Sequence, residues 1–290
     1  MSECRAVVDC GNVLGESVRW DARTRRVLWA DIDRAELWWL DPATSEVGKI
    51  DMPERLCAFA ARRSGGLLVA FASKLAYFHA DWGVTVPIPD SGPGETDTRW
   101  NDGRCDRRGR FLIGSSYEGS AGKRTASLWQ FDGVGRKRLV SGVRVSNAIC
   151  FSPDGKTMYF ADSIEASIWA FDYDEESGSI ANRREFCSLQ DQPGVPDGAT
   201  VDEAGYLWNA QWGGGRILRY RPDGSVDRIV ELPISQPTCV SFGGPDLSTL
   251  YITSARLGLS REQLEREPLA GSLFALTPGV KGLPENLYAG

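Results

Sequence analysis

Short apolar runs separated by polar turns follow one another along most of the chain. In the clearest group, β-prone runs occupy residues 147–151, 158–162, 168–172 and 184–187. Runs this short, rich in aromatic and branched side chains, predict strands. The Pro-Asp-Gly sequence at 153–155 predicts a tight turn after the first of them. The group therefore predicts four consecutive antiparallel strands.

The same arrangement occurs six times. The copies begin at Glu16, Cys57, Asn101, Asn147, Asp197 and Thr238, which are 41, 44, 46, 50 and 41 residues apart. This period is that of one propeller blade, and no long amphipathic helices alternate with the strands. We therefore predict an all-β fold, a six-bladed β-propeller of four-stranded antiparallel blades, formed by residues 1–290 as a single domain.

Three segments fall outside the regular repeat. One helix is predicted after Ser260, because Gln263 completes a capping box and Pro268 lies near the end of the segment. The last copy has only a short, proline-containing fourth segment, at 283–289. The run at 5–9 is predicted to pair into that last blade and so to close the ring and tie the termini together.

Composition and charge exclude several classes of protein. The net charge is −6 and the basic residues are scattered, so no basic face for nucleic acid is expected. No window of about 18 apolar residues would span a membrane, and the first eleven residues do not resemble a secretory signal. The seven cysteines are odd in number and lack CxxC spacing, which indicates free thiols and a cytoplasmic location.

The repeat also predicts which distant residues meet. The first strand of each blade lines the central channel, so the six starting residues are expected at one mouth of it. Four of them carry carboxylate or amide oxygen donors, namely Glu16, Asn101, Asn147 and Asp197. Each of these alone is more simply a turn or strand-start residue. Together they have a formal charge of −2 and only oxygen ligands, which suits a hard divalent cation. Cys57 is interpreted as a packing residue.

Other candidate sites are weaker. His79 is the only histidine and is predicted on a third strand, away from the channel, which excludes a Ser-His-Asp triad or a Cys-His pair. The glycines at 213–215 lack the Lys-Ser/Thr and the helix of a phosphate-binding loop, so they indicate a turn.

Several motifs, in order along the chain, resemble those of one known family. They are Leu14-Gly-Glu-Ser17, Arg99-Trp-Asn-Asp-Gly103, Ser146-Asn147, Phe171-Asp-Tyr-Asp174, Pro196-Asp-Gly198, and Phe242-Gly-Gly244 with Ala255-Arg256. From about Gly15 to the closing Tyr288-Ala-Gly290, the chain resembles the gluconolactonase/regucalcin (senescence-marker-protein) family. The resemblance implies a six-bladed propeller with one divalent metal at the channel mouth and hydrolysis of sugar lactones.

The resemblance also assigns roles to residues. It implies Glu16, Asn147 and Asp197 as metal ligands, and Arg99 and Asn101 as residues that hold sugar hydroxyls and a water of the metal site. Where some members have a substrate-binding Glu, this chain has Gly119, so Glu118 is the candidate substitute. Ca²⁺ is the favoured ion, with Zn²⁺, Mn²⁺, Mg²⁺ and Fe²⁺ as alternatives.

The function predicted from these observations is metal-dependent hydrolysis of an aldonolactone, a pentono- or hexonolactone, with Asp197 as the catalytic proton acceptor. A non-catalytic, calcium-binding or scaffold propeller is the alternative. A scaffold protein, however, has no need of acidic side chains such as Glu16 and Asp197 that point into the channel. A metal-dependent esterase or phosphotriesterase is a third interpretation, which would require an apolar pocket. The sequence predicts neither the particular sugar nor the oligomeric state.

Overall fold

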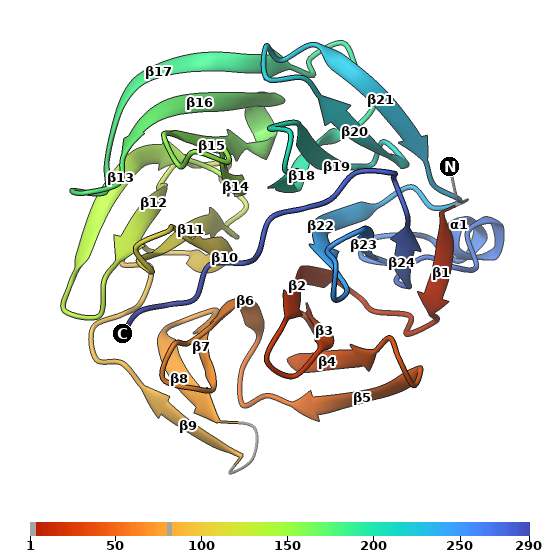
Figure 1. Cartoon of the computed structure of the whole chain (residues 1–290), viewed down its shortest axis with the longest axis horizontal. Helices are drawn as coiled ribbons and strands as arrows, with labels where there is room; N and C mark the ends of the chain where they lie inside the picture. Colours follow the sequence, from red (N-terminus) through yellow and green to blue (C-terminus); the bar gives the residue numbers. More distant parts are fainter. Residues whose placement is uncertain (1–3, 80–82) are drawn as a thin grey trace.

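The strands form six four-stranded antiparallel sheets arranged around a central axis (Figure 1). The structure is a computed structural model, and it describes residues 4–79 and 83–290. The predicted fold class, a six-bladed β-propeller, is confirmed. In five of the sheets the strand order follows the chain from the inner strand to the outer strand, as expected for blades built from successive hairpins.

Each blade is named here by its order along the chain. Blade 1 contains β2 (Gly15–Asp21), β3 (Arg26–Asp31), β4 (Glu36–Asp41) and β5 (Glu46–Asp51). Blade 2 contains β6 (Leu56–Ala61), β7 (Leu67–Phe71), β8 (Leu75–His79) and β9 (Val84–Pro87). Blade 3 contains β10 (Thr98–Cys105), β11 (Phe111–Tyr117), β12 (Ala126–Phe131) and β13 (Arg136–Val143).

The second half of the ring continues in the same way. Blade 4 contains β14 (Ser146–Phe151), β15 (Thr157–Asp162), β16 (Ser167–Asp174) and β17 (Ser179–Ser188), with the short 3₁₀ helix η2 (Ser163–Glu165) after β15. Blade 5 contains β18 (Val195–Val201), β19 (Leu207–Trp212), β20 (Arg216–Tyr220) and β21 (Val226–Glu231). Blade 6 contains β22 (Pro237–Gly243), β23 (Thr249–Ser254) and β24 (Leu273–Leu276), and its fourth strand is β1 (Arg5–Val8).

The core lies in the layers between neighbouring blades. Trp29, Trp100 and Trp208 are almost completely buried there, together with many aliphatic side chains of the inner strands. Burying a large apolar side chain stabilises a fold by about 1.5–3 kcal/mol relative to exposing it. The abundance of tryptophan is therefore explained by flat side chains that fill the space between sheets.

The ring is closed by the N-terminal strand, as predicted. β1 pairs antiparallel with β24, so the last blade has the order β1-β24-β23-β22. The short, proline-containing segment at 283–289 forms no strand in this blade. β1 already occupies the edge of β24, and Pro284 lacks the N–H group that a strand needs. The termini are consequently not tied together, and the C-terminus lies across the ring near blades 2 and 3 (Figure 1).

The single α-helix of the described residues is the predicted one. Helix α1 (Arg261–Arg266) lies between β23 and β24. The Ser260 side chain accepts from the backbone N–H of Gln263, and the Gln263 side chain accepts from the backbone N–H of Ser260. This reciprocal pair satisfies two N–H groups that a helix start leaves without partners.

All six inner strands share a local irregularity. The pairing of each inner strand with its neighbour shifts register close to the position that begins the sequence repeat, as between Glu16 and Arg19 in β2 and between Asn147 and Cys150 in β14. Such β-bulges bend a strand and redirect its side chains. The sequence repeat therefore marks the point where each inner strand is bent by a bulge.

Candidate metal centre and active site

The predicted site residues come together at one mouth of the channel. A cavity of about 240 Å³ is lined by Glu16, Asn101, Asn147, Asp197 and Arg99, among others. They come from blades 1, 3, 4 and 5, so four separate parts of the chain meet there. Asn147 and Asp197 are only 5% and 6% exposed.

Unusual backbone conformations hold two of these side chains in place. Ser17, which follows Glu16, and Ala148, which follows Asn147, have φ angles of 54° and 56°. The left-handed region is unfavourable for residues with a Cβ, and such conformations concentrate at functional sites. Asp197 is followed instead by Gly198, where a Cβ would lie 2.7 Å from the Sγ atom of Cys239. Only glycine fits between the inner strands of blades 5 and 6 at this point.

The polar side chains of blades 3 and 4 are hydrogen-bonded to one another. Arg99 donates from Nη1 to Oδ1 of Asn101, at 2.6 Å. Asn101 donates from Nδ2 to Oδ1 of Asn147, at 3.0 Å, and to the carbonyl oxygen of Ser146, at 2.9 Å. Asn147 Oδ1 accepts one hydrogen bond in this way and has a second lone pair left for another partner.

The two carboxyl groups of the site share an environment that opposes their ionisation. Burial, followed by repulsion from Asp102, raises the pKa of Glu16 to about 7. Burial, followed by the neighbouring Glu16 carboxyl group, raises the pKa of Asp197 well above its usual range. Two neighbouring carboxyl groups that are both shielded from water ionise together only if a positive charge compensates them.

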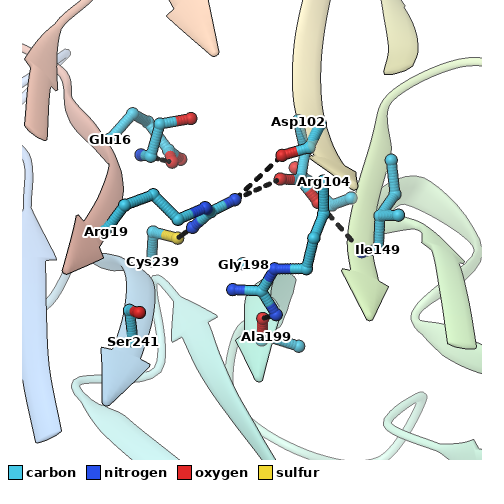
Figure 2. Close-up of polar contacts among 12 residues, drawn as sticks. Glu16, Arg19, Asp102, Arg104, Ile149, Gly198, Ala199, Cys239 and Ser241 are labelled. Atoms are coloured by element: carbon cyan, nitrogen blue, oxygen red, sulfur yellow. Dashed lines mark hydrogen bonds and ion pairs between the residues drawn. The ribbon is translucent and has the colours of Figure 1, made fainter. Parts of the chain in front are cut away.

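A second layer of charged residues lies below the site in the channel. Arg19 is 3.8 Å from the Asp102 carboxylate and donates to the carbonyl oxygen of Gly103 at 2.9 Å. Arg104 donates to the carbonyl oxygen of Ala199 at 2.9 Å and to Glu285 at 3.1 Å. Figure 2 shows both guanidinium groups reaching into the channel between the inner strands.

The charges of this lower layer compensate one another. Burial raises the pKa of Glu285, but the adjacent Arg104 and Arg19 outweigh it and hold that pKa below its usual range. Arg19 and Asp102 form the other pair. At the mouth, Arg99 is ion-paired with Glu118. Among the described residues, no Lys or Arg forms an ion pair with Glu16 or Asp197.

The residues at the mouth therefore fit a divalent cation. The ionised Glu16 and Asp197 supply a charge of −2, and Asn147 supplies a neutral oxygen donor, a set that hard cations prefer. No three His, Cys, Asp or Glu side chains form a metal-binding group in residues 4–79 and 83–290. This is consistent with a site that has only two carboxylates and completes its donor set with an amide.

The other two repeat-equivalent residues hold blades together. Cys57 accepts, through its carbonyl oxygen, a hydrogen bond from the Ser17 hydroxyl at 3.0 Å. Thr238 donates to the carbonyl oxygen of Gly15. Burial raises the pKa of the Cys57 thiol to about 11, so the thiol stays neutral. These contacts support the interpretation of Cys57 as a packing residue.

Glu118 lies at the rim of the site. It follows β11 and accepts from Arg99 Nε at 3.1 Å. Both of its oxygens also accept from Arg55, at 2.8 Å each, and the pKa of Glu118 is lowered chiefly by Arg55 and then by Arg99. At Gly119, a Cβ would lie 2.2 Å from the Tyr117 hydroxyl. Tyr117 thus occupies the space that a longer side chain at 119 would need.

The sequence did not indicate Arg55, Ser163 or the lower layer. Arg55 and Ser163 come from a loop and from η2, each in a single blade, so the repeat carries no signal for them. A signal did exist for Arg19 and Arg104, which lie three residues after Glu16 and Asn101 in their inner strands. The same offset in β22 gives Ser241, which donates to Glu285 at 3.1 Å.

The far mouth of the channel is crossed by the C-terminal segment, residues 282–290 (Figure 1). This strap is bridged to blade 5 at Asp202–Gly282 and to blade 2 at Arg62–Tyr288. It lines two cavities of about 310 and 230 Å³, both bordered by Arg104 and by the far ends of inner strands. Tyr288 is completely buried, stacked on Phe131 at 6.0 Å between ring centroids.

Comparison with known proteins shows which family the chain belongs to. Residues 14–256 match the SMP-30/Gluconolactonase/LRE-like region. The chain belongs to this family. An L-arabinolactonase of Azospirillum brasilense is 40% identical over 288 residues, which is 98% of this chain and 95% of that protein. A 6-deoxy-6-sulfogluconolactonase of Pseudomonas putida is 38% identical over 289 residues, 99% of this chain and 98% of that protein.

Solved structures of the SMP-30/gluconolactonase family have the same fold. A calcium-binding protein, regucalcin, from Agrobacterium tumefaciens superimposes with a TM-score of 0.92 at 30% identity. The match covers 98% of this chain and 96% of that one. In the described part of this family member, no helix has the length and apolar character needed to cross a membrane.

Proposed function

We propose that this protein is a sugar lactonase, which hydrolyses an aldonolactone of five or six carbons to the open-chain acid with the help of one divalent cation, Ca²⁺ being the favoured ion. The observation that carries the proposal is the pair Glu16 and Asp197, two adjacent carboxyl groups that form no ion pair with a Lys or Arg among the described residues, in a cavity whose other polar groups suit a polyol. Two relatives named as lactonases of sugar derivatives support the substrate class.

Glu16, Asn147 and Asp197 would hold the cation. A cation there supplies Lewis-acid stabilisation of the negative charge that develops on the lactone carbonyl oxygen. Asp197 accepts the proton of the attacking water and returns it to the departing ring oxygen. Its buried position keeps competing water away from the carboxylate.

Arg99 and Asn101 orient the sugar. Arg99 is mostly buried, with 12% of its side chain exposed, and is held by Glu118 and Asn101, so its guanidinium is fixed before the substrate arrives. A fixed donor costs less ordering entropy on binding than a flexible one. Glu118 is proposed to contact substrate hydroxyls from the rim.

The seven cysteines form no disulfide, which agrees with the cytoplasmic location proposed here.

A panel of aldonolactones tests the activity. Acid release from arabinono-, xylono-, galactono- and gluconolactone is measured with a pH indicator, with and without a chelator. Because the carboxylate pair requires a cation to act, we expect hydrolysis that stops with chelator and returns when Ca²⁺, Mn²⁺ or Zn²⁺ is added in excess. Hydrolysis that continues unchanged after complete removal of metal would contradict the proposal. Cation binding without hydrolysis of any lactone would favour the calcium-binding alternative.

Removing Arg55 should weaken substrate binding. In Arg55→Met, Glu118 loses its bidentate partner and holds Arg99 less firmly. Arg55 and Glu118 are 38% and 39% exposed, and exposed pairs contribute about 0.2–1 kcal/mol. We therefore expect KM to rise about two- to fivefold, with kcat nearly unchanged. The matched control is Arg63→Met, since Arg63 is exposed and its side chain contacts the carbonyl oxygen of Arg108. If Arg55→Met changed kcat and left KM unaltered, the proposed role of Arg55 in substrate binding would be contradicted.

A further inference from the structure

A chain of four hydrogen bonds runs along the site from blade 3 to blade 5. Every donor in it points the same way. The bonds run from Arg99 Nη1 to Asn101 Oδ1 (2.6 Å), from Asn101 Nδ2 to Asn147 Oδ1 (3.0 Å), from Asn147 Nδ2 to Ser163 Oγ (2.9 Å), and from Ser163 Oγ to the carbonyl oxygen of Pro196 (2.7 Å). Pro196 directly precedes Asp197.

The two ends of this chain fix its direction. A guanidinium group only donates hydrogen bonds, and a backbone carbonyl only accepts them. Each amide between them must therefore present its oxygen toward Arg99 and its nitrogen toward Ser163. If the Asn147 amide turned over, its NH₂ group would face the NH₂ group of Asn101, and its oxygen would compete with Pro196 for the single hydroxyl proton of Ser163.

Ser163 is itself held rigidly. It begins η2, whose N-cap is Asp162, and it is 5% exposed. Its backbone N–H donates to the carbonyl oxygen of Val145 at 3.0 Å. Its side chain borders the same cavity as Glu16, Asn147 and Asp197. The hydroxyl is thus a fixed point between the strand of Asn147 and the strand of Asp197.

We propose that Ser163 is a positioning residue of the metal site, which holds the Asn147 amide so that its oxygen faces the cation and joins this residue to the strand of Asp197. The inference rests on the proposed metal site. Groups that orient metal ligands in this way typically affect affinity 10- to 100-fold when removed. Without the Ser163 hydroxyl, the buried Asn147 nitrogen has lost its acceptor, and the orientation of the amide is held only by the hydrogen bond from Asn101.

The experiment measures cation affinity and needs no substrate. Metal-free protein is titrated with Ca²⁺ and with Mn²⁺ by calorimetry, and folding of each variant is checked by thermal denaturation. For Ser163→Ala we expect binding weakened about 10- to 100-fold. For Ser163→Thr, which keeps the hydroxyl, we expect affinity within about threefold of the wild type. Equal affinity of Ser163→Ala and wild type would overturn the proposal, as would a Thr variant as weak as the Ala variant.

A matched control separates positioning from simple loss of a buried hydroxyl. Ser115 is also fully buried, and its hydroxyl likewise accepts one hydrogen bond, from Ser127 N, and donates one, to Ser127 O. Ser115→Ala should leave the affinity unchanged. If it weakened binding as much as Ser163→Ala does, the effect would be one of general stability, and the positioning role would be wrong.

A second test uses the symmetry of a carboxylate. In Asn147→Asp the ligand has two equivalent oxygens, so its orientation no longer matters. Adding Ser163→Ala to Asn147→Asp should therefore change affinity by much less than Ser163→Ala changes the wild type, and a full 10-fold loss would contradict the proposal. Wild-type protein that binds no cation would overturn this inference and the proposed function together, whereas a wild type that binds and a Ser163→Ala variant that binds equally would overturn this inference alone.

Discussion

Replacing Asp197 by asparagine should lower kcat/KM for the best lactone by about 10³-fold, because the change removes both a ligand charge and the proton acceptor. Asparagine keeps the size of the side chain, so the inner strand of blade 5 should remain folded. The effect is measured from initial rates of acid release at saturating metal, alongside calorimetric titration with Ca²⁺. Cation binding should weaken in parallel.

The control for this variant is Asp172→Asn. Asp172 is an exposed carboxylate on β16 that pairs with Arg184 at 2.7 Å, far along its strand from the channel. Its replacement should change turnover by less than about twofold, since surface substitutions away from special features have small effects. Asp197→Asn that keeps more than a tenth of wild-type activity would show that another group accepts the proton.

Metal-free protein should become less stable as the pH rises from about 5 to 8. The pKa of Glu16 is about 7 in the fold, against 4.5 as its ordinary value, and that of Asp197 is shifted in the same direction. Between these values the folded protein holds a proton that the unfolded chain has released, so raising the pH favours unfolding. The two carboxyl groups titrate as a pair, and together they should cost the metal-free fold on the order of 3 kcal/mol across this window.

Urea denaturation at pH 5, 6, 7 and 8, with chelator or with saturating Ca²⁺, checks this prediction. A bound cation keeps both carboxylates ionised in the fold, so the loaded protein should not lose this stability, and cation binding should tighten as the pH rises. Glu16→Gln should reduce the pH dependence of the chelated protein. The quantity compared is the difference in free energy of unfolding between the Ca²⁺-loaded and the chelated protein. If this difference were the same at pH 8 as at pH 5, the raised pKa values of the buried carboxyl pair would be contradicted.

The repeat made the main features of the site predictable. Equivalent positions in six similar blades must surround one axis, so Glu16, Asn101, Asn147 and Asp197 could be brought together without knowing any other contact. The bulge at each of these positions is a backbone feature that the residue types do not show. The sequence therefore indicated where the side chains meet, and the structure explains why they turn inward.

Symmetry could not reveal what occurs only once. Ser163 and Arg55 lie in a short 3₁₀ helix and a loop, elements that differ from blade to blade. The pairing of the N-terminal run with the last blade was predicted and is confirmed. The expectation that this pairing would tie the termini together was wrong, because residues 282–290 leave the last blade and cross the ring to blade 2 (Figure 1), a course that a local pattern does not show.

The strap across the far mouth limits how molecules can pass through the ring. Residues 282–290 bridge opposite blades, and Glu285 is ion-paired with Arg104 in the channel below the site. We therefore expect a lactone to enter, and the acid formed from it to leave, through the mouth lined by Glu16 and Asp197. Accumulated acid is then expected to slow the enzyme by competing with the lactone for this mouth.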